Sequence, residues 1–343
     1  MVDVAVDSLQ CKHYQLHLGD LLEQTLHATN ARTSVGAPSA IYLVGTGALG
    51  VGLDAVEALL SPLLKVPILR VNSHRPVRYS STALVLGASF AGDTPETTEH
   101  LLRALDAGAD VAVVAGFGPL CETVTSRGGQ HLTLDAAAPG PRWAMLQCVV
   151  TTLIALSDLL PVGEATVVRE HAERGISRFH TRNNDQTAWD EATTLARRID
   201  RTMVLALGSG DLGGVAAHRL ASQVEENAKT FAVALKYPEL GYSTVAGFGQ
   251  CGDLTRQVFT AIEVCEGSEV AADVRRRAVV ADILDEHVAS RLTLVGEGDS
   301  PLEQFFDLVA QVDQLSLCLA AHVGIDPGPV PAIVEVKQAA AAT

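Results

Sequence analysis

The sequence is poor in cysteine, lysine and aromatic residues, and it has no long uninterrupted apolar run. Six cysteines stand singly in 343 residues, without a CxxC pair, which fits a reducing compartment and argues against a structural zinc site. The longest apolar stretch, residues 143–160, contains Gln147 and Asp158, so we expect a buried helix there and not a membrane span. No basic segment followed by an apolar one opens the chain, so no secretory signal is expected. These absences predict a cytoplasmic protein.

Basic residues are also few. Forty acidic residues against 25 basic ones give a net charge of −15, and no stripe of lysine and arginine is visible. Nucleic acids and membrane surfaces are therefore not expected as partners. Eleven histidines include no HExxH motif, so no metal site is expected. Only five basic residues are lysines, which makes the position of each lysine informative.

Apolar segments alternate with amphipathic ones through the first half of the chain. This alternation predicts a parallel sheet covered by helices on both faces. A helix is expected over residues 18–26 before the first strand. The expected strands cover residues 41–44, 67–71, 82–88, 111–115 and 132–134, and helices are expected over 94–106 and 119–125.

The second half repeats this pattern after a charged helical segment over residues 163–199. Pro161, Val162 and Gly163 mark the expected boundary, which gives a first domain over residues 1–161 and a second over 162–343. Two domains are the natural expectation for a chain of this length. Strands are expected near residues 202–207, 231–235, 257–263 and 292–295, and a long helix over 301–323.

A strand, a GxGxxG loop and a helix occur twice, with the loops starting at Gly45 and Gly208. This resembles an internal duplication of one α/β unit. GxGxxG is also a dinucleotide-binding fingerprint, but the carboxylate expected at the end of the next strand is missing. Arg70 and Arg75 could suit a 2′-phosphate, so nicotinamide binding remains a minority alternative.

The segment from Thr82 to Leu102 predicts an anion site. An apolar strand turns through Ser89, Gly92 and Thr94 into a helix with proline at its first position. The free N–H groups and the positive dipole at such a helix start attract phosphate. The alternative is an ordinary strand-to-helix turn with good capping.

Three further sites stand out. Glu225 and Glu226 end a helix where carboxylates oppose the helix dipole, which often marks a functional site, although a solvated turn is the alternative. Arg142 follows a Pro-Gly-Pro segment before a buried helix, and the alternative is a plain helix start. Lys337, taken alone, reads as a solvated lysine near the C-terminus, and the three arginines at 275–277 read as a solvated helix face.

Taken together, these motifs make the chain resemble the bifunctional phosphoglucose/phosphomannose isomerases, a branch of the sugar isomerase (SIS) domain proteins. SFAGDTPET at residues 89–97 is similar to the family's SYSGNTEET phosphate loop, and PRWAM at 141–145 to PRxAL. EENAK at 225–229 is similar to NENAK. Residues 313–337 are similar to an ending of the form DxxSxYLA…GxDPxxVxxIxxLK. The four motifs occur in order over nearly the whole chain.

The resemblance implies two SIS-type α/β domains, each a doubly wound, flavodoxin-like parallel sheet sandwiched by helices. It also implies a homodimer with active sites at the subunit interface, and a phosphorylated hexose as the ligand. The reaction expected is the interconversion of glucose 6-phosphate or mannose 6-phosphate with fructose 6-phosphate. No metal or redox cofactor is needed for it.

Such an isomerase moves a proton between C1 and C2 through an enediolate, which requires a base, a cation near the developing charge and an acid/base pair for ring opening. The resemblance implies that Glu226 is the base, that Arg142 stabilises the enediolate and that Lys337 assists ring opening. Ser89 and Thr94 would hold the phosphate.

The backbone of the first loop, Gly45, Thr46 and Gly47, would also contact the phosphate, as would the loop around Gly92. Thr46 stands beside the place of the serine hydroxyl in the family's GGSG loop, and Ala91 replaces a serine of the phosphate loop.

Tyr242 is the main departure from the family pattern. It occupies the place of the family's ring-opening histidine, sixteen positions after Glu226. Tyrosine can donate a proton, but with an ordinary pKa of about 10 it is a poor base near neutrality. The alternative function is therefore a catalytically impaired SIS protein that binds a phosphosugar as a regulator or partner of a sugar-phosphate enzyme.

Overall fold

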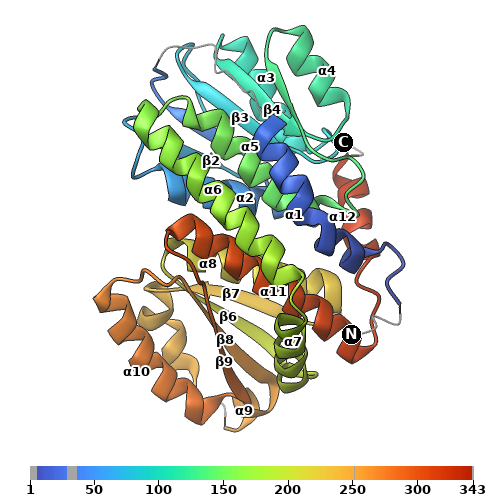
Figure 1. Cartoon of the computed structure of the whole chain (residues 1–343), viewed down its shortest axis with the longest axis vertical. Helices are drawn as coiled ribbons and strands as arrows, with labels where there is room; N and C mark the ends of the chain where they lie inside the picture. The colour runs from blue at the N-terminus through green and yellow to red at the C-terminus, as the bar shows by residue number, and fades with distance from the viewer. Residues whose placement is uncertain (1–5, 29–36, 251, 342–343) are drawn as a thin grey trace. The chain divides into compact units, whose positions relative to one another are not determined.

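The chain forms two compact units in the computed structural model, which describes residues 6–28, 37–250 and 252–341 (Figure 1). We call Asp20–Glu173, with the segment from Val330 onward, the five-stranded unit. Arg174–Pro329, with the segment up to Gly19, is the four-stranded unit. The domain boundary expected at residues 161 and 162 stays a prediction. Cys251, one of the six single cysteines, lies outside the described residues.

The sheet of the five-stranded unit is entirely parallel, with the order β2-β1-β3-β4-β5. The first strand lies inside the sheet, and the strand order reverses between β1 and β3, which is the flavodoxin-like topology. The strands are β1 (Ile41–Val44), β2 (Ile68–Val71), β3 (Leu84–Ala88), β4 (Asp110–Ala115) and β5 (Gln130–Thr133).

Helices cover both faces of this sheet (Figure 1). α3 (Pro95–Asp106) and α4 (Pro119–Ser126) pack apolar side chains into a cluster with β3 and β4. α2 (Gly47–Leu60) packs closely on α5 (Met145–Ser157). All thirteen residues of α5 are buried, which confirms the buried helix expected from the apolar stretch. α1 (Cys11–Ala28) extends beyond its expected range at both ends.

The four-stranded sheet is also parallel and has the order β7-β6-β8-β9. Its strands are β6 (Met203–Ser209), β7 (Ala232–Lys236), β8 (Phe259–Cys265) and β9 (Ser290–Val295). α8 (Asp211–Ala228), α11 (Pro301–Val323) and α7 (Gln186–Ile199) form one helical layer, and α10 (Ala271–His287) packs on the opposite face (Figure 1). The predicted α/β class with two flavodoxin-like parallel sheets is confirmed.

The charged helical segment expected over residues 163–199 is in fact two helices. α6 (Val162–Asn183) ends before Asn184, and α7 starts after Asp185. The Asp185 carboxylate accepts a hydrogen bond of 2.9 Å from the Thr187 N–H group and caps the new helix. An N-cap of this kind ends one helix and starts another without a glycine or proline, so the break escaped the sequence analysis.

Short elements complete the chain. They are the 3₁₀ turns η1 (Pro141–Ala144), η2 (Glu239–Tyr242) and η3 (Thr244–Gly247), and the helices α9 (Leu254–Val258) and α12 (Pro331–Ala341). Within the described ranges, no helix combines the length and apolarity needed to cross a membrane.

Candidate functional site

The first glycine-rich loop and the Ser89 loop leave neighbouring strands of the five-stranded unit. β1 and β3 pair in parallel, so both loops emerge at the same edge of the sheet. The strand order reverses between these two strands. Ligands of open α/β sheets bind in the crevice at such a switch point, outside the carboxyl ends of the strands. The structure thus brings Gly45, Thr46 and Gly47 to the same place as the Ser89 loop.

The first loop needs its glycines for close backbone approach. Gly47 has φ of +59°, in the left-handed region, and a Cβ atom on Gly50 would lie 2.9 Å from the Gly45 carbonyl oxygen. Arg70 of β2 donates to the carbonyl oxygens of Gly50 at 3.0 Å, Gly45 at 3.3 Å and Leu43. The Arg70 guanidinium therefore supports the loop backbone, which weakens the alternative that it binds a 2′-phosphate.

Ser89 holds the second loop in shape. Its buried hydroxyl accepts hydrogen bonds of 3.2 Å from the N–H groups of Asp93 and Thr94, and it bonds the Thr94 hydroxyl at 2.8 Å. The Ser89 hydroxyl and the N–H groups of the loop therefore bond one another at the start of α3. A ligand at this place meets the Thr94 hydroxyl and the first turn of α3.

Backbone packing against a third loop fixes the position of Gly92. A Cβ atom on Gly92 would lie 2.4 Å from the Phe117 carbonyl oxygen, and one on Gly118 would lie 1.9 Å from the Ala91 carbonyl oxygen. Both glycines have positive φ, +60° and +108°. No side chain fits between these backbones, so the loop after β4 supports the Ser89 loop directly.

The helix starts at these loops are open to an anion. The N-cap residues are Thr46 before α2 and Thr94 before α3. In the part of the chain that the structure describes, neither side chain accepts a hydrogen bond from the first turn of its own helix. The first N–H groups of a helix have no intrahelical acceptor, and the helix dipole favours a negative charge beside them. Both helix starts therefore favour an anion.

The second glycine-rich loop is occupied by the protein itself. The Glu266 carboxylate, just after β8, accepts a 3.0 Å hydrogen bond from the Leu212 N–H group in the first turn of α8. A Cβ atom on Gly210 would lie 2.2 Å from that carboxylate. Burial raises the pKa of Glu266, while the bond from Leu212 lowers it less. A carboxylate thus lies against Gly210, whereas a Cβ atom on Gly47, at the same position of the first glycine-rich loop, would meet no atom within 4 Å.

The contacts of Arg277, near this loop, correct the expectation of a solvated helix face. Arg277 was expected on a solvated helix face, but it is mostly buried and its Nη2 atom lies 2.9 Å from Glu269. Glu269 also accepts a hydrogen bond from the Ser209 hydroxyl. The expectation for Arg277 was wrong because its partner lies eight residues away, outside the helix.

Arg142 lies on η1, directly before α5, and η1 packs on α2. Its side chain is only 3% exposed, and its guanidinium carbon lies 5.8 Å from the centre of the Trp143 ring. A buried arginine held by stacking keeps a fixed position.

Glu226 lies in the last turn of α8 and is half-buried. The helix ends at Ala228, and its C-cap residue Lys229 adopts a left-handed conformation with φ of +54°. The Lys229 ammonium group donates to the Glu226 carbonyl oxygen. A cation at this end offsets the unfavourable interaction of the Glu225 and Glu226 carboxylates with the helix dipole.

Tyr242 and Lys337 are both exposed. Tyr242 ends η2 with 78% of its surface accessible, and the Arg276 guanidinium carbon lies 5.6 Å from the centre of its ring. Lys337 lies on α12. Glu226 and Tyr242 belong to the four-stranded unit, whereas Arg142, Lys337, the first glycine-rich loop and the Ser89 loop belong to the five-stranded unit.

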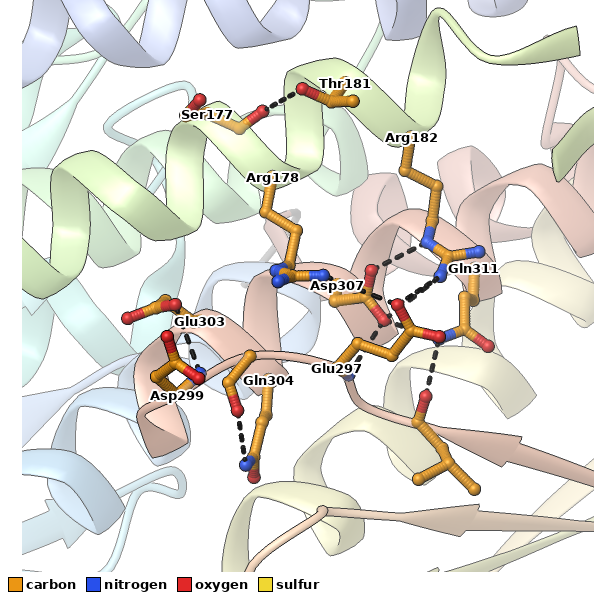
Figure 2. A network of polar contacts seen from close by, with 12 residues as sticks. Ser177, Arg178, Thr181, Arg182, Glu297, Asp299, Glu303, Gln304, Asp307 and Gln311 are labelled. Carbon is orange, nitrogen blue, oxygen red and sulfur yellow. Dashed lines mark hydrogen bonds and ion pairs between the residues drawn. The ribbon is translucent and has the colours of Figure 1, made fainter.

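A polar cavity of about 640 Å³ in the four-stranded unit contains none of the predicted site residues. Arginines from successive turns of α6 face carboxylates of α11 and of the loop before it (Figure 2). Arg182 bonds Asp307 at 2.7 Å, and Arg174 bonds Glu303 at 2.9 Å. Burial alone would raise the pKa of Glu303, but the hydrogen bonds that its carboxylate accepts from Arg174 and two other donors lower it. This cluster pairs its charges internally.

Metal-binding groups do not gather in the described ranges: no three histidine, cysteine, aspartate or glutamate side chains there are arranged to hold an ion. The roles of Glu266, Arg70 and Gly118 in supporting or filling the loops did not follow from the sequence. Only the glycine at 118, between a strand and a proline, gave a local signal.

Comparisons with known proteins agree with this architecture. The profile of the bacterial phospho-glucose isomerase C-terminal SIS domain matches residues 188–339. The C-terminal domain of glucosamine-fructose-6-phosphate aminotransferase from Francisella tularensis superposes with a TM-score of 0.72 at 14% identity, over 92% of this chain and 97% of that one. At that identity the likeness shows the fold alone.

Two curated relatives cover most of the chain. A bifunctional phosphoglucose/phosphomannose isomerase from Caldicellulosiruptor bescii is 23% identical over 85% of this chain and 87% of its own length. Another, from Aeropyrum pernix, is 30% identical over 87% of this chain and 88% of its own length. The chain belongs to the bifunctional phosphoglucose/phosphomannose isomerase family.

Proposed function

We propose that this protein interconverts glucose 6-phosphate or mannose 6-phosphate with fructose 6-phosphate. The observation that carries the proposal is the contrast between the two glycine-rich loops. The loops after β1 and β3 present two helix N-termini at the switch point, whereas the corresponding place at α8 is filled by Glu266. In a chain of this family, the first pair of loops is the natural phosphate site.

The proposed mechanism uses one carboxylate and two cations. Glu226 takes the proton from C2 of the aldose phosphate and returns it to C1. Arg142 stabilises the negative charge on the enediolate oxygens, for which its fixed guanidinium is well suited. Lys337 assists ring opening.

The phosphate would be held by groups of both loops. Ser89 shapes the second loop through its bonds to Asp93 and Thr94, so its role is to present the Thr94 hydroxyl and the N–H groups of α3. The backbone of Gly45, Thr46 and Gly47 would contact the phosphate from the other side.

We also propose that the protein is a homodimer. Sedimentation velocity, which measures the mass of the particle in solution, tests this.

The test is a coupled assay with fructose 6-phosphate that follows glucose 6-phosphate and mannose 6-phosphate separately. A Glu226→Gln variant, purified in parallel, controls for isomerase from the expression host. Removal of a general base typically costs 10²- to 10⁴-fold in rate, so we expect the variant to lose about 10³-fold. Equal turnover in the two preparations would sink the isomerase proposal.

A second candidate function is phosphosugar binding without turnover. Tyr242, at the place where the resemblance expects a histidine, is 78% exposed and packs on Arg276. Binding of fructose 6-phosphate by calorimetry, with no product after long incubation at high protein concentration, would favour this candidate.

A further inference from the structure

A buried polar seam joins α8 to α11 in the four-stranded unit. Arg219, Gln223 and Asn227 are spaced four residues apart, so they lie along one stripe of α8. On α11 they face Asp313 and Ser316. All five side chains are at most 3% exposed. We call these five residues the α8–α11 seam.

The bonds of the seam are short and specific. Arg219 contacts both carboxylate oxygens of Asp313, at 2.9 and 2.8 Å, and the Gln223 amide donates to Asp313 at 2.9 Å. The Asn227 amide donates to the Ser316 hydroxyl at 2.9 Å. The Ser316 hydroxyl in turn donates to the Asp313 carbonyl oxygen at 2.9 Å.

Stability alone gives no reason for such a seam. Removing two charges from water costs about as much as their attraction returns, and well-packed apolar residues of similar volume are often as stable or more so. An apolar helix contact also tolerates small axial shifts. Directional hydrogen bonds at about 2.9 Å do not. The seam therefore fixes the axial register of α8 against α11.

The seam reaches the turn that carries Glu226. Asn227 is its sequence neighbour, and Gln223 lies one turn earlier on α8. Helix ends fray unless they are held, and here the last turn of α8 is tied sideways to Ser316. A base must stay within about 0.5 Å of its productive position, and a displacement of about 1 Å can cost 100-fold in rate.

We propose that Asp313 and Ser316 are positioning residues for the base Glu226, holding the last turn of α8 in register. This inference rests on the proposed isomerase function. In this proposal the α8–α11 seam affects the rate of catalysis through the position of Glu226, and not through the stability of the fold.

The first test is Ser316→Ala with a matched control. Ser157→Ala removes the same kind of bond, because the Ser157 hydroxyl also donates to the carbonyl oxygen three residues earlier and is also buried. Ser157 is not part of the α8–α11 seam. We expect Ser316→Ala to lower kcat about tenfold with KM within twofold, and Ser157→Ala to leave both unchanged. Ser316→Ala should also melt at a lower temperature than Ser157→Ala, because it removes the acceptor of the buried Asn227 amide as well, so kcat is compared below both melting transitions. Ser316→Thr, which keeps the hydroxyl, should recover most of kcat.

The second test separates register from stability. A triple variant (Arg219→Met, Gln223→Met, Asp313→Val) replaces the buried polar groups with apolar ones of about the same volume. We expect a melting temperature equal to or above that of the wild type, and kcat lowered 10- to 100-fold. Inorganic phosphate, titrated by calorimetry, should bind both proteins equally.

Unchanged kcat in Ser316→Ala, or in a folded triple variant, would overturn the positioning role while leaving the isomerase proposal intact. A tenfold loss shared by Ser157→Ala would overturn it as well, since the effect would then be general. Absence of turnover in the wild type itself would overturn the proposed function and this inference together.

Discussion

Replacing Arg70 with methionine should unfold the first glycine-rich loop, although Arg70 contacts no ligand in the proposed mechanism. Its guanidinium donates to three backbone carbonyl oxygens, those of Leu43, Gly45 and Gly50. It also pairs with Asp54 of α2 at 2.6 Å. The side chain is 12% exposed, so methionine fills its volume but supplies no donor.

The expected cost follows from these bonds. An acceptor that loses its partner inside a protein costs about 1–3 kcal/mol. At about 1–2 kcal/mol for each of the three carbonyls, in the lower part of this range, the loss is about 3–6 kcal/mol. The pair with Asp54 adds at most about 1 kcal/mol, since the Asp54 side chain is 39% exposed. This is a large part of the 5–15 kcal/mol typical of a domain.

Urea unfolding followed by circular dichroism measures the loss in the free energy of unfolding. Calorimetric titration with inorganic phosphate measures whether the loop still binds an anion. Arg75→Met is the matched control, because Arg75 is an exposed arginine just beyond β2. It should change the free energy of unfolding by less than about 0.5 kcal/mol. Asp54→Asn isolates the ion pair and should cost about 1 kcal/mol or less.

A loss of stability in Arg70→Met no larger than that in Arg75→Met would contradict this role of Arg70. So would an Asp54→Asn variant that accounts for the whole loss, since the carbonyl bonds would then contribute nothing. Phosphate affinity should fall in Arg70→Met and stay unchanged in Arg75→Met.

Three further outcomes are expected. Gly118→Ala should destabilise the protein by about 2–4 kcal/mol in urea unfolding and weaken phosphate binding, because its φ is +108° and the new Cβ atom would lie 1.9 Å from the Ala91 carbonyl oxygen. Glu266→Gln should be increasingly more stable than the wild type as pH rises from 4 to 8, because burial raises the pKa of Glu266 and folding then disfavours its charged form at higher pH. Glu303→Gln should be less stable by about 1–2 kcal/mol at pH 7, with the difference shrinking below pH 4, because Arg174 and neighbouring donors lower the pKa of Glu303 and the wild-type advantage disappears once the carboxylate is protonated.

Each of these has a contrary result. Gly128 also has a positive φ, +87°, but a Cβ atom there would meet no atom within 4 Å. If Gly128→Ala lost as much stability as Gly118→Ala, the loss at Gly118 would come from backbone strain alone and not from the close contact with Ala91. A stability difference for Glu266→Gln that does not change with pH would contradict its raised pKa. For Glu303→Gln, the contrary result is a difference that grows towards acid pH.

The α/β class, the two parallel sheets and most element positions followed from the sequence. β1 and α11 begin and end at the expected residues. Apolar runs of four or five residues between glycine-rich turns are typical of buried parallel strands, and the N-cap and proline at the start of α3 are local signals. The residues proposed to bind the phosphate could be named from the sequence because each of the two loops consists of consecutive residues after one strand; their role stays a prediction.

What only the tertiary structure decided are the pairings between distant residues. Glu266 reaches the first turn of α8 across 54 positions, and Asp313 meets Arg219 across 94. No local pattern distinguishes the glycine-rich loop that is open from the one that Glu266 fills, since both read GxGxxG. Local propensity and periodicity specify strands, turns and caps, whereas the partner of a buried charge is chosen by the packing of the whole unit.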